Sequence, residues 1–179
     1  DYTDVAPADF KKTHHNADFS RVLAKRKPTD VAAAAGSKID WRSKGAVTHV
    51  KNQKSCGGCW SFSTTGNIEG QWQIAGNTLT SLSEQELLSC DLTGGNQGCK
   101  GGLMDNAFKW ATANGGICSE ADYPYTSGTT KTAGTCKKTC TAVPNSAPTS
   151  HTDVQKSSDS AMMSALAKQP VSIAIEADK

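Results

Sequence analysis

Apolar residues and one threonine recur at helical spacing in the segment that follows Cys59. The residues that define this spacing are Thr65, Ile68, Trp72 and Ala75. Gly76-Asn77 comes next and is typical of a helix C-terminus, so the pattern predicts one helix from Cys59 to about Ala75. Gly66 and Gly70 lower the helix propensity of this segment. We therefore expect packing against neighbouring elements to stabilise the helix.

Two further helices are predicted in the middle of the chain. Ser83 and Glu86 have the spacing of a capping box, with Ser83 as the N-cap and Glu86 at the third helical position. The helix that they begin continues to Cys90. The other helix spans about Leu103 to Ala113 and is followed by Gly115-Gly116, a C-terminal stop signal. Its apolar face is formed by Met104, Ala107, Phe108 and Ala111.

The last third of the chain is less regular. Residues 122–152 are rich in turn-forming residues and show little periodicity, so we expect loops there. A short helix is predicted from Ser160 to Ala167. Pro170 then precedes the alternating stretch Val171–Ile175, which is typical of a strand. The pattern thus predicts a mainly helical unit followed by the beginning of a β-rich part.

Length and charge limit the classes of protein to consider. The 179 residues suit one domain, or one domain with an appendage. Lysine and arginine (19) nearly balance aspartate and glutamate (17), so nothing favours a nucleic acid or an anionic membrane as partner. No apolar run is long enough for a transmembrane helix. The acidic and polar start, Asp1 to Asp4, is not typical of a signal peptide.

The seven cysteines favour an oxidising compartment. Their odd number is what one free thiol and three disulfides would give, although spacing alone does not determine the pairing. Residues 1–34 differ from the rest, because they contain no cysteine or glycine and end in the basic run Lys25–Pro28 and an alanine run. Such a segment reads either as a processed arm or as a disordered tail.

The run from Gln53 to Trp60 contains the candidate chemistry. Cys59 is predicted to begin a helix, where the positive end of the helix dipole favours the thiolate and lowers the pKa of a thiol. The side-chain amide of Gln53 could donate a hydrogen bond to a developing oxyanion if the chain folds back. Together these features indicate a nucleophilic cysteine.

Other interpretations of the Cys56-x-x-Cys59 pair remain open at this point. A redox dithiol of the thioredoxin type has its tryptophan before the first cysteine, whereas Trp60 follows the second one. A zinc site would need a second close pair, and Cys90 and Cys99 are too far apart to suit it. The two cysteines could also simply be halves of structural disulfides.

The run around Cys59 resembles the active-site segment of papain-like cysteine peptidases. Gly58 departs from the serine or alanine most common there. The resemblance is continuous from Ile39-Asp40-Trp41-Arg42 and covers about four-fifths of the chain. It implies an α+β fold, with a disulfide-crosslinked helical left domain and the first strand of an incomplete β-barrel right domain. It also implies that residues 1–34 are the remnant of a propeptide and that residues 35–179 are a truncated peptidase domain.

The resemblance assigns roles to the cysteines and to the wall of a substrate cleft. Cys59 aligns with the nucleophile, and the backbone amide of Cys59 with Gln53 would hold the oxyanion. Residues Cys99 to Asp105 resemble the cathepsin L form of the cleft wall, in which bare glycine backbone lets an extended peptide approach. The implied disulfides are Cys56–Cys99, Cys90–Cys136 and an additional pair, Cys118–Cys140, whose alternative is two free thiols. The implied substrate contacts are Gly101, Gly102, Leu103, Met104 and Ala174, although a turn followed by a core helix would use the same residues.

The catalytic histidine and asparagine of the family are expected beyond residue 179. They lie roughly 130–150 residues after the cysteine. The histidines present are His14, His15, His49 and His151, and we expect each to be a surface residue. Residues 1–179 alone are therefore expected not to turn over peptides.

The function implied is that of a cathepsin L-like cysteine endopeptidase, which is made as a zymogen and acts through a thiol acyl-enzyme. The expected partners are peptide or protein substrates, its own propeptide and cystatin-like inhibitors. No cofactor or metal is expected, and the expected state is a monomer in the lysosome or vacuole, or a secreted one. The alternative is a non-catalytic, disulfide-stabilised peptide-binding fragment or an inactive homologue.

Overall fold

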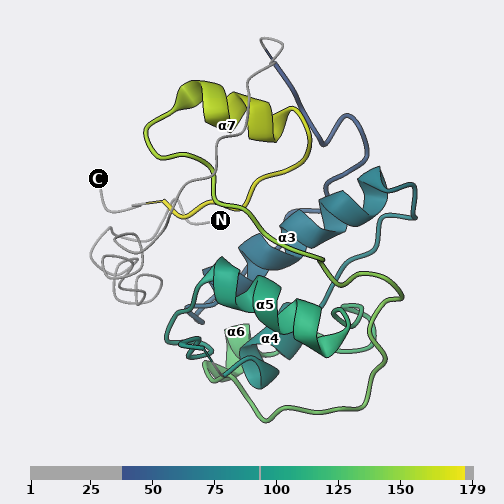
Figure 1. Cartoon of the computed structure of the whole chain (residues 1–179). Helices are drawn as coiled ribbons and strands as arrows, with labels where there is room; N and C mark the ends of the chain where they lie inside the picture. The colour runs from purple at the N-terminus through teal and green to yellow at the C-terminus, as the bar shows by residue number, and fades with distance from the viewer. Residues whose placement is uncertain (1–37, 93, 176–179) are drawn as a thin grey trace.

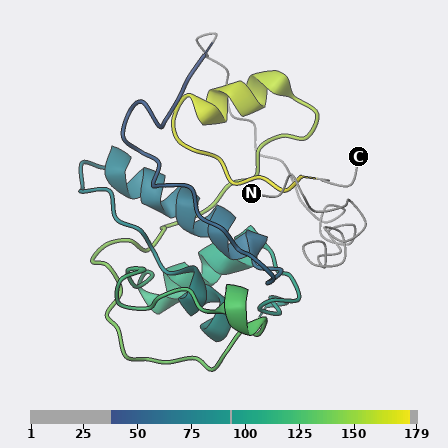
Figure 2. The same cartoon turned by 180° about the vertical axis from the view of Figure 1, so that it is seen from behind.

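The structure is a computed structural model that describes residues 38–92 and 94–175. Figures 1 and 2 show helix α3 crossing the middle of the molecule, with α4, α5 and α6 on one side and α7 on the other. The helices are α3 (Cys59–Ile74), α4 (Glu84–Cys90), α5 (Met104–Asn114), α6 (Ser127–Thr130) and α7 (Asp159–Leu166). Within the described residues, no helix is long and apolar enough to cross a membrane.

The predicted helices are confirmed to within about two residues at their ends, and only the single turn α6 was not expected. The face of α5 that is buried consists of the four residues that its apolar pattern indicated: Met104, Ala107, Phe108 and Ala111. Gly115 ends α5 in the left-handed conformation, with φ 79°, which a glycine adopts without steric cost. The predicted propeptide remnant, residues 1–34, lies outside the described residues.

The core forms where α3 packs against α4 and α5. Trp60, Leu87 and Leu88 are completely buried there, in the same cluster of buried residues as the apolar face of α5. Helix α3 does not have the apolar stripe of an amphipathic helix, because its buried residues also include Ser61, Thr64, Thr65 and Glu69. The interface of α3 with α4 is therefore partly polar.

Charged groups lie inside this polar interface. The Nζ atom of Lys51 is 2.6 Å from a carboxylate oxygen of Glu69 on α3 and 2.6 Å from one of Glu84 on α4. Both carboxylates are 1% exposed. Burial alone would lower the pKa of Lys51, but Glu84 and Glu69 together raise it, so the lysine stays charged. Burial raises the pKa of Glu84, opposed by Lys51 and by the Thr65 hydroxyl.

The N-terminus of α4 follows only half of the predicted capping box. The Ser83 hydroxyl accepts from the Glu86 N–H at 3.0 Å, as expected for an N-cap. Glu86 does not return to the Ser83 N–H, because its carboxylate accepts from the Cys118 N–H at 2.7 Å. The Ser83 N–H donates instead to the Cys118 carbonyl at 2.9 Å. Tertiary contacts with the segment around Cys118 thus replace the second local bond.

The strand expected at Val171–Ile175 does not form, and this part of the prediction is wrong for the described residues. Residues 171–175 form no ladder, and the β-pairing within the described ranges consists of two isolated bridges elsewhere, Gly57 with Lys100 and Leu82 with Ser119. The segment lies along α3 instead, where the Ser172 hydroxyl donates to the Ser63 carbonyl at 2.8 Å. A strand needs a neighbour to satisfy its backbone groups, and the described residues offer none.

Three disulfides connect the irregular segments to the helical core. They are Cys56–Cys99, Cys90–Cys136 and Cys118–Cys140, the same pairs that the resemblance implied. They close loops whose ends are 43, 46 and 22 residues apart. In the chain-entropy model each contributes about 3–4 kcal/mol by restricting the unfolded chain.

The buried ion cluster gives a first prediction. Replacing Lys51 with alanine leaves Glu69 and Glu84 buried without a cation, so we expect the free energy of unfolding at pH 7 to fall by about 3–5 kcal/mol. The loss should be smaller at pH 5, because the carboxylate of Glu84, whose pKa burial raises, takes up a proton in the folded state as the pH falls. Urea denaturation at both pH values measures this.

The exposed Lys109 on α5 provides the control for this test. Its replacement with alanine should change the free energy of unfolding by less than about 0.5 kcal/mol. Equal losses for Lys51→Ala and Lys109→Ala would show that the buried cluster does not stabilise the α3–α4 interface.

Candidate active site

Cys59 is the first residue of α3, and Gly58 is its N-cap. It is the free cysteine among the described residues, and it is exposed. The loop before it is fixed by the Cys56–Cys99 disulfide and by the hydrogen bond from the Gly57 N–H to the Cys99 carbonyl, at 3.0 Å. The peptide that precedes the thiol is therefore attached to the segment that leads into α5.

The expectation of a lowered thiol pKa is wrong for the described residues. Desolvation by the surrounding protein raises the pKa of the Cys59 thiol, and the backbone N–H groups of Trp60 and Cys59 oppose this only in part. The helix dipole is worth about 0.3–1 kcal/mol at an exposed position. No cationic side chain of the described residues contributes to this pKa. A reactive thiolate therefore needs a positive partner in addition to the helix N-terminus.

An aromatic residue, Tyr125, binds the main chain at Gln53. The Tyr125 hydroxyl donates to the Gln53 carbonyl at 2.6 Å, and the Tyr125 ring meets the Phe62 ring edge to face, with centroids 5.0 Å apart. Phe62 lies on α3, three residues after Cys59. Within the part of the chain that the structure describes, no hydrogen bond involves the side-chain amide of Gln53.

The glycine segment before α5 is packed tightly against the residue after the thiol. A Cβ atom on Gly102 would lie 2.7 Å from the Trp60 ring and 2.7 Å from Asn96 Oδ1. Trp60 itself is fixed by a hydrogen bond from its Nε1 to the Gly98 carbonyl, at 3.1 Å. Gly102 therefore permits a close approach between α3 and the segment that leads into α5, which larger residues would prevent.

Most backbone groups of this segment are already used. The Gly101 carbonyl accepts from the Gln97 N–H, and the Gly101 N–H donates to the Gly98 carbonyl. The Leu103 N–H donates to Asn96 Oδ1, and the Leu103 carbonyl accepts from the Ala107 N–H. Among the described residues, none bonds to the N–H or the carbonyl of Gly102. One donor and one acceptor of Gly102, a buried residue next to Trp60, thus have no partner in this part of the chain.

The expected apolar contacts differ in accessibility. Met104 is 7% exposed and packs in the core, Leu103 is half-buried, and Ala174 is exposed. The interpretation of this segment as a turn followed by a core helix is therefore confirmed for Met104. Leu103 and Ala174 keep surface that a ligand can reach.

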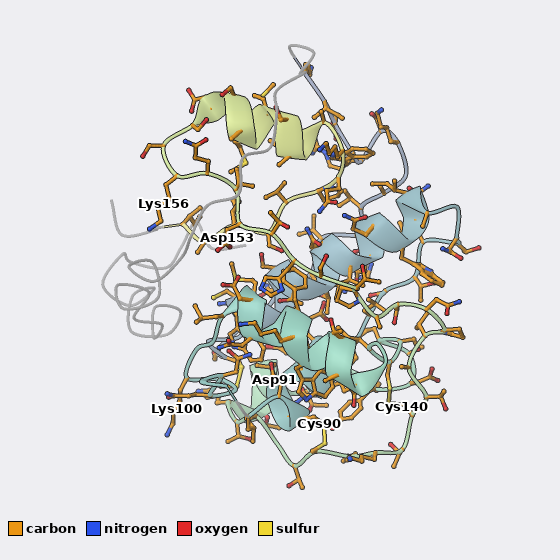
Figure 3. The ribbon with its side chains drawn as sticks, in the orientation of Figure 1. Cys90, Asp91, Lys100, Cys140, Asp153 and Lys156 are labelled. Carbon is orange, nitrogen blue, oxygen red and sulfur yellow. A yellow bond between two sulfur atoms is a disulfide. The ribbon has the colours of Figure 1, made fainter. Side chains whose placement is uncertain are left out.

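A pair of buried polar residues, which was not predicted from the sequence, lies below this segment. Asp91, at the end of α4, is 1% exposed and accepts from Asn96 Nδ2 at 2.5 Å. Burial raises the pKa of Asp91 to about 6, opposed by the hydrogen bond from Asn96. Figure 3 shows Asp91 near Cys90 at the end of α4, while Lys100 projects from the edge of the molecule. No sequence motif distinguishes this pair, because its burial follows from the packing of α4, of which all residues but Cys90 are buried.

Neither described histidine has contacts typical of a catalytic base. The His151 ring is stacked on Phe108 of α5, with centroids 5.9 Å apart. His49 is exposed and lies in a hollow of about 260 Å³ that Phe62 and Tyr125 also line, whereas Cys59 does not. The other two histidines, at positions 14 and 15, lie outside the described residues.

One group of potential metal ligands occurs within the described ranges, formed by Glu86, Cys118 and Cys140. Two of its members form a disulfide, so their sulfur atoms are not thiolates that could bind a metal. The carboxylate of Glu86 is engaged by the Cys118 N–H. These residues therefore do not fit a metal centre.

Comparison with known proteins identifies the class to which this fold and site belong. The model of the papain family cysteine proteases matches residues 35–179, and the chain is a member of that family. It is 43% identical over 183 residues to a cysteine proteinase of Trypanosoma brucei brucei, which covers 99% of this chain. It is 42% identical over 184 residues to cysteine protease XCP2 of Arabidopsis thaliana, again over 99% of this chain.

A solved structure is similar over most of the molecule. It is the ragweed pollen allergen Amb a 11, a cysteine protease, in its proform, with a TM-score of 0.75 and 33% sequence identity over 94% of this chain. The chain spans only part of these proteins, namely 40% and 50% of the two relatives and 52% of the allergen chain. The papain-like α+β fold class is therefore shown, with the helical left domain as the part that is described.

The disulfide pattern predicts the reactivity of the thiols. Alkylation of the folded chain without reductant should label Cys59 and leave the other six cysteines linked as three pairs. Peptide mapping by mass spectrometry measures this. Labelling of Cys118 or Cys140 in folded protein would contradict the third disulfide.

The raised pKa of Asp91 leads to a prediction of how the free energy of unfolding depends on pH. Its pKa is raised from 3.8 in the unfolded chain to about 6, so between these values the folded state binds a proton that the unfolded state has released. Stability should therefore fall as the pH rises from 4 to 7, with a contribution from Asp91 on the order of 3 kcal/mol. Asp91→Asn should remove that contribution.

Urea denaturation of the disulfide-intact chain at several pH values measures the difference. Burial also raises the pKa of Glu84, Glu86 and Glu120, so both proteins retain some pH dependence of the same sign. Identical slopes for the parent chain and Asp91→Asn would contradict the assignment.

Proposed function

We propose that this chain is the thiol-bearing part of a cysteine endopeptidase. The observation that carries the proposal is the position of Cys59, a free and exposed cysteine at the first residue of α3. The next residue, Trp60, contacts Gly102, whose N–H and carbonyl are not used within the described part. The nucleophile therefore precedes the residue that contacts Gly102, whose two backbone groups have no partner in the described part.

The proposed reaction is acyl transfer through the thiol. Cys59 Sγ attacks the carbonyl carbon of the scissile peptide bond, and the bond to the leaving amine breaks as the acyl-enzyme forms. The Cys59 N–H and the Gln53 side-chain amide stabilise the oxyanion. Water then hydrolyses the thioester and restores the thiol. An imidazole must take the thiol proton and give it to the leaving amine.

We propose that this imidazole and the asparagine that orients it belong to the remainder of the complete protein, because the relatives are about twice as long. The raised pKa of the isolated Cys59 thiol supports this proposal. An imidazolium placed beside Cys59 would favour the thiolate and reverse that shift.

The proposed substrate is an extended peptide that adds alongside Gly102. Its backbone would bond to the Gly102 N–H and carbonyl in the manner of strand addition, and an apolar side chain would contact Leu103 and Ala174. Gly101 would belong to the same wall, and Met104 packs in the core below it. Residues 1–34 are proposed to be the end of a propeptide, and residues 35–179 part of the peptidase domain.

The remaining proposals concern the setting of the enzyme. We propose that it functions in a lysosome or vacuole or outside the cell, since three disulfides are stable in oxidising compartments. Cystatin-like inhibitors and a monomeric state are further proposals. A second function, that of a non-catalytic peptide-binding homologue, is favoured if the complete sequence lacks the histidine and asparagine.

The proposal predicts cysteine-dependent proteolysis by the complete protein. Cys59→Ala should abolish hydrolysis of a fluorogenic peptide, and Gln53→Ala should lower kcat about 10²–10³-fold, as loss of one oxyanion donor does elsewhere. Lys109→Ala serves as an exposed control and should retain full activity. Turnover by Cys59→Ala at the rate of the parent would contradict the proposed mechanism.

The pocket predicts specificity at the second residue before the scissile bond. Leu103 and the small Ala174 favour leucine or phenylalanine there, and burying such a side chain is worth roughly 1.5–3 kcal/mol. We therefore expect at least tenfold higher kcat/KM than for a polar residue at that position. A substrate library measures this, and a preference for arginine would contradict the assignment.

A further inference from the structure

Asn96 lies below the glycine segment, and both ends of its side-chain amide are bonded. Nδ2 donates to Asp91 Oδ2 at 2.5 Å, and Oδ1 accepts from the Leu103 N–H at 2.7 Å. Asn96 is 2% exposed and Asp91 is 1% exposed. Asn106 Nδ2 is 3.5 Å from the same Oδ1 and donates to the Gly94 carbonyl at 2.7 Å. The pair therefore connects the end of α4 to the residue that precedes α5.

Asp91 determines which way the amide of Asn96 faces. Above its pKa of about 6 the Asp91 carboxylate is ionised and only accepts hydrogen bonds, whereas the two ends of the amide are a donor and an acceptor. A reversed amide would place its oxygen against the Asp91 carboxylate and its nitrogen against the Leu103 N–H. Both contacts would then be repulsive in a buried site, where unpaired polar groups cost about 1–3 kcal/mol. The Leu103 N–H is thereby held toward the interior.

Asn96 packs directly against Gly102. Asn96 Oδ1 occupies the space on one side of Gly102, because a Cβ there would lie 2.7 Å away. It also holds the next residue, Leu103, by its N–H. The side chain thus supports the strip of backbone whose N–H and carbonyl have no partner in the described part of the chain.

We propose that Asn96, oriented by Asp91, is a positioning residue for substrate: it fixes the Gly101–Leu103 wall so that the Gly102 backbone meets an extended peptide. It acts through the Leu103 N–H and does not touch the substrate. The inference rests on the proposed function of Cys59 and of this wall. A buried carboxylate that serves stability alone is unfavourable, because an apolar residue of similar size avoids its desolvation cost.

Two reagents that react with Cys59 separate positioning from stability in the complete protein. Iodoacetamide needs only the thiol, whereas a peptidyl vinyl sulfone with leucine at its second position also needs the wall. Asn96→Ala should raise the half-saturating concentration of the vinyl sulfone on the order of tenfold, the equivalent of about 1.4 kcal/mol. The limiting inactivation rate with the vinyl sulfone and the reaction rate with iodoacetamide should each change less than about twofold, which is far less than the expected tenfold change in half-saturation.

Asp91 provides a conservative pair of variants. Asp91→Asn retains an acceptor for Asn96 Nδ2 and should bind the vinyl sulfone nearly as well as the parent protein. Asp91→Ala removes the acceptor and should behave as Asn96→Ala does. The pair keeps the test decisive if Asn96→Ala does not fold, because the proposal requires the alanine variant to bind more weakly than the asparagine variant.

Ser146→Ala is the matched control for lost stability. Ser146 is 3% exposed, and its hydroxyl accepts from the Ile117 N–H at 3.2 Å, after the end of α5. The variant should unfold more readily but keep the half-saturating concentration of the parent protein. Equal half-saturation for Asn96→Ala, Asp91→Ala and the parent would overturn the inference while leaving the proposed function intact. If the peptidyl part of the vinyl sulfone does not improve binding to the parent protein, both the inference and the proposed function are wrong.

Discussion

The contact between Trp60 and Gly102 is the constraint on which the candidate site depends. It joins the helix that begins with Cys59 to the backbone wall beside it, and it leaves no room for a side chain at position 102. The indole is completely buried, so its position is fixed by the core. Because Trp60 follows Cys59 directly, the packing of the core also determines where the thiol lies relative to the wall.

The buried polar groups of this domain lie at the interfaces that position the site. Lys51 joins α3 to α4 through Glu69 and Glu84, and Asp91 joins the end of α4 to the wall through Asn96. Buried charges of this kind contribute little net stability compared with apolar packing, but each removal of one partner is costly. They fix the relative position of elements that apolar contacts alone would leave less specified.

Much of the fold could be predicted from the sequence because its signals are local. The helix that begins at Cys59, the N-cap Ser83 and the stop at Gly115 each depend on neighbouring residues, and the structure confirms them. The second half of the capping box could not be predicted, because the choice made by Glu86 depends on a backbone N–H 32 residues away. The strand predicted at 171–175 does not form for a similar reason, because a strand requires a neighbouring strand to which its backbone can bond.

The site was less accessible to sequence reasoning than the fold. The motif around Cys59 and the glycines at 101 and 102 identify candidates, but the thiol pKa depends on how far the folded protein desolvates the thiol. The Asp91–Asn96 pair has no motif that distinguishes it from an exposed polar loop. Its role depends on the Asn96 amide bonding to Asp91 at one end and to the Leu103 N–H at the other, and only the three-dimensional structure shows these contacts.

The most direct test is a crystal structure of the complete protein after reaction with a peptidyl vinyl sulfone. The account predicts a thioether at Cys59 Sγ and an extended peptide whose backbone bonds to both the N–H and the carbonyl of Gly102. Modification of another residue would contradict it. A peptide bound at Cys59 with the Gly102 groups still unpaired would contradict it too.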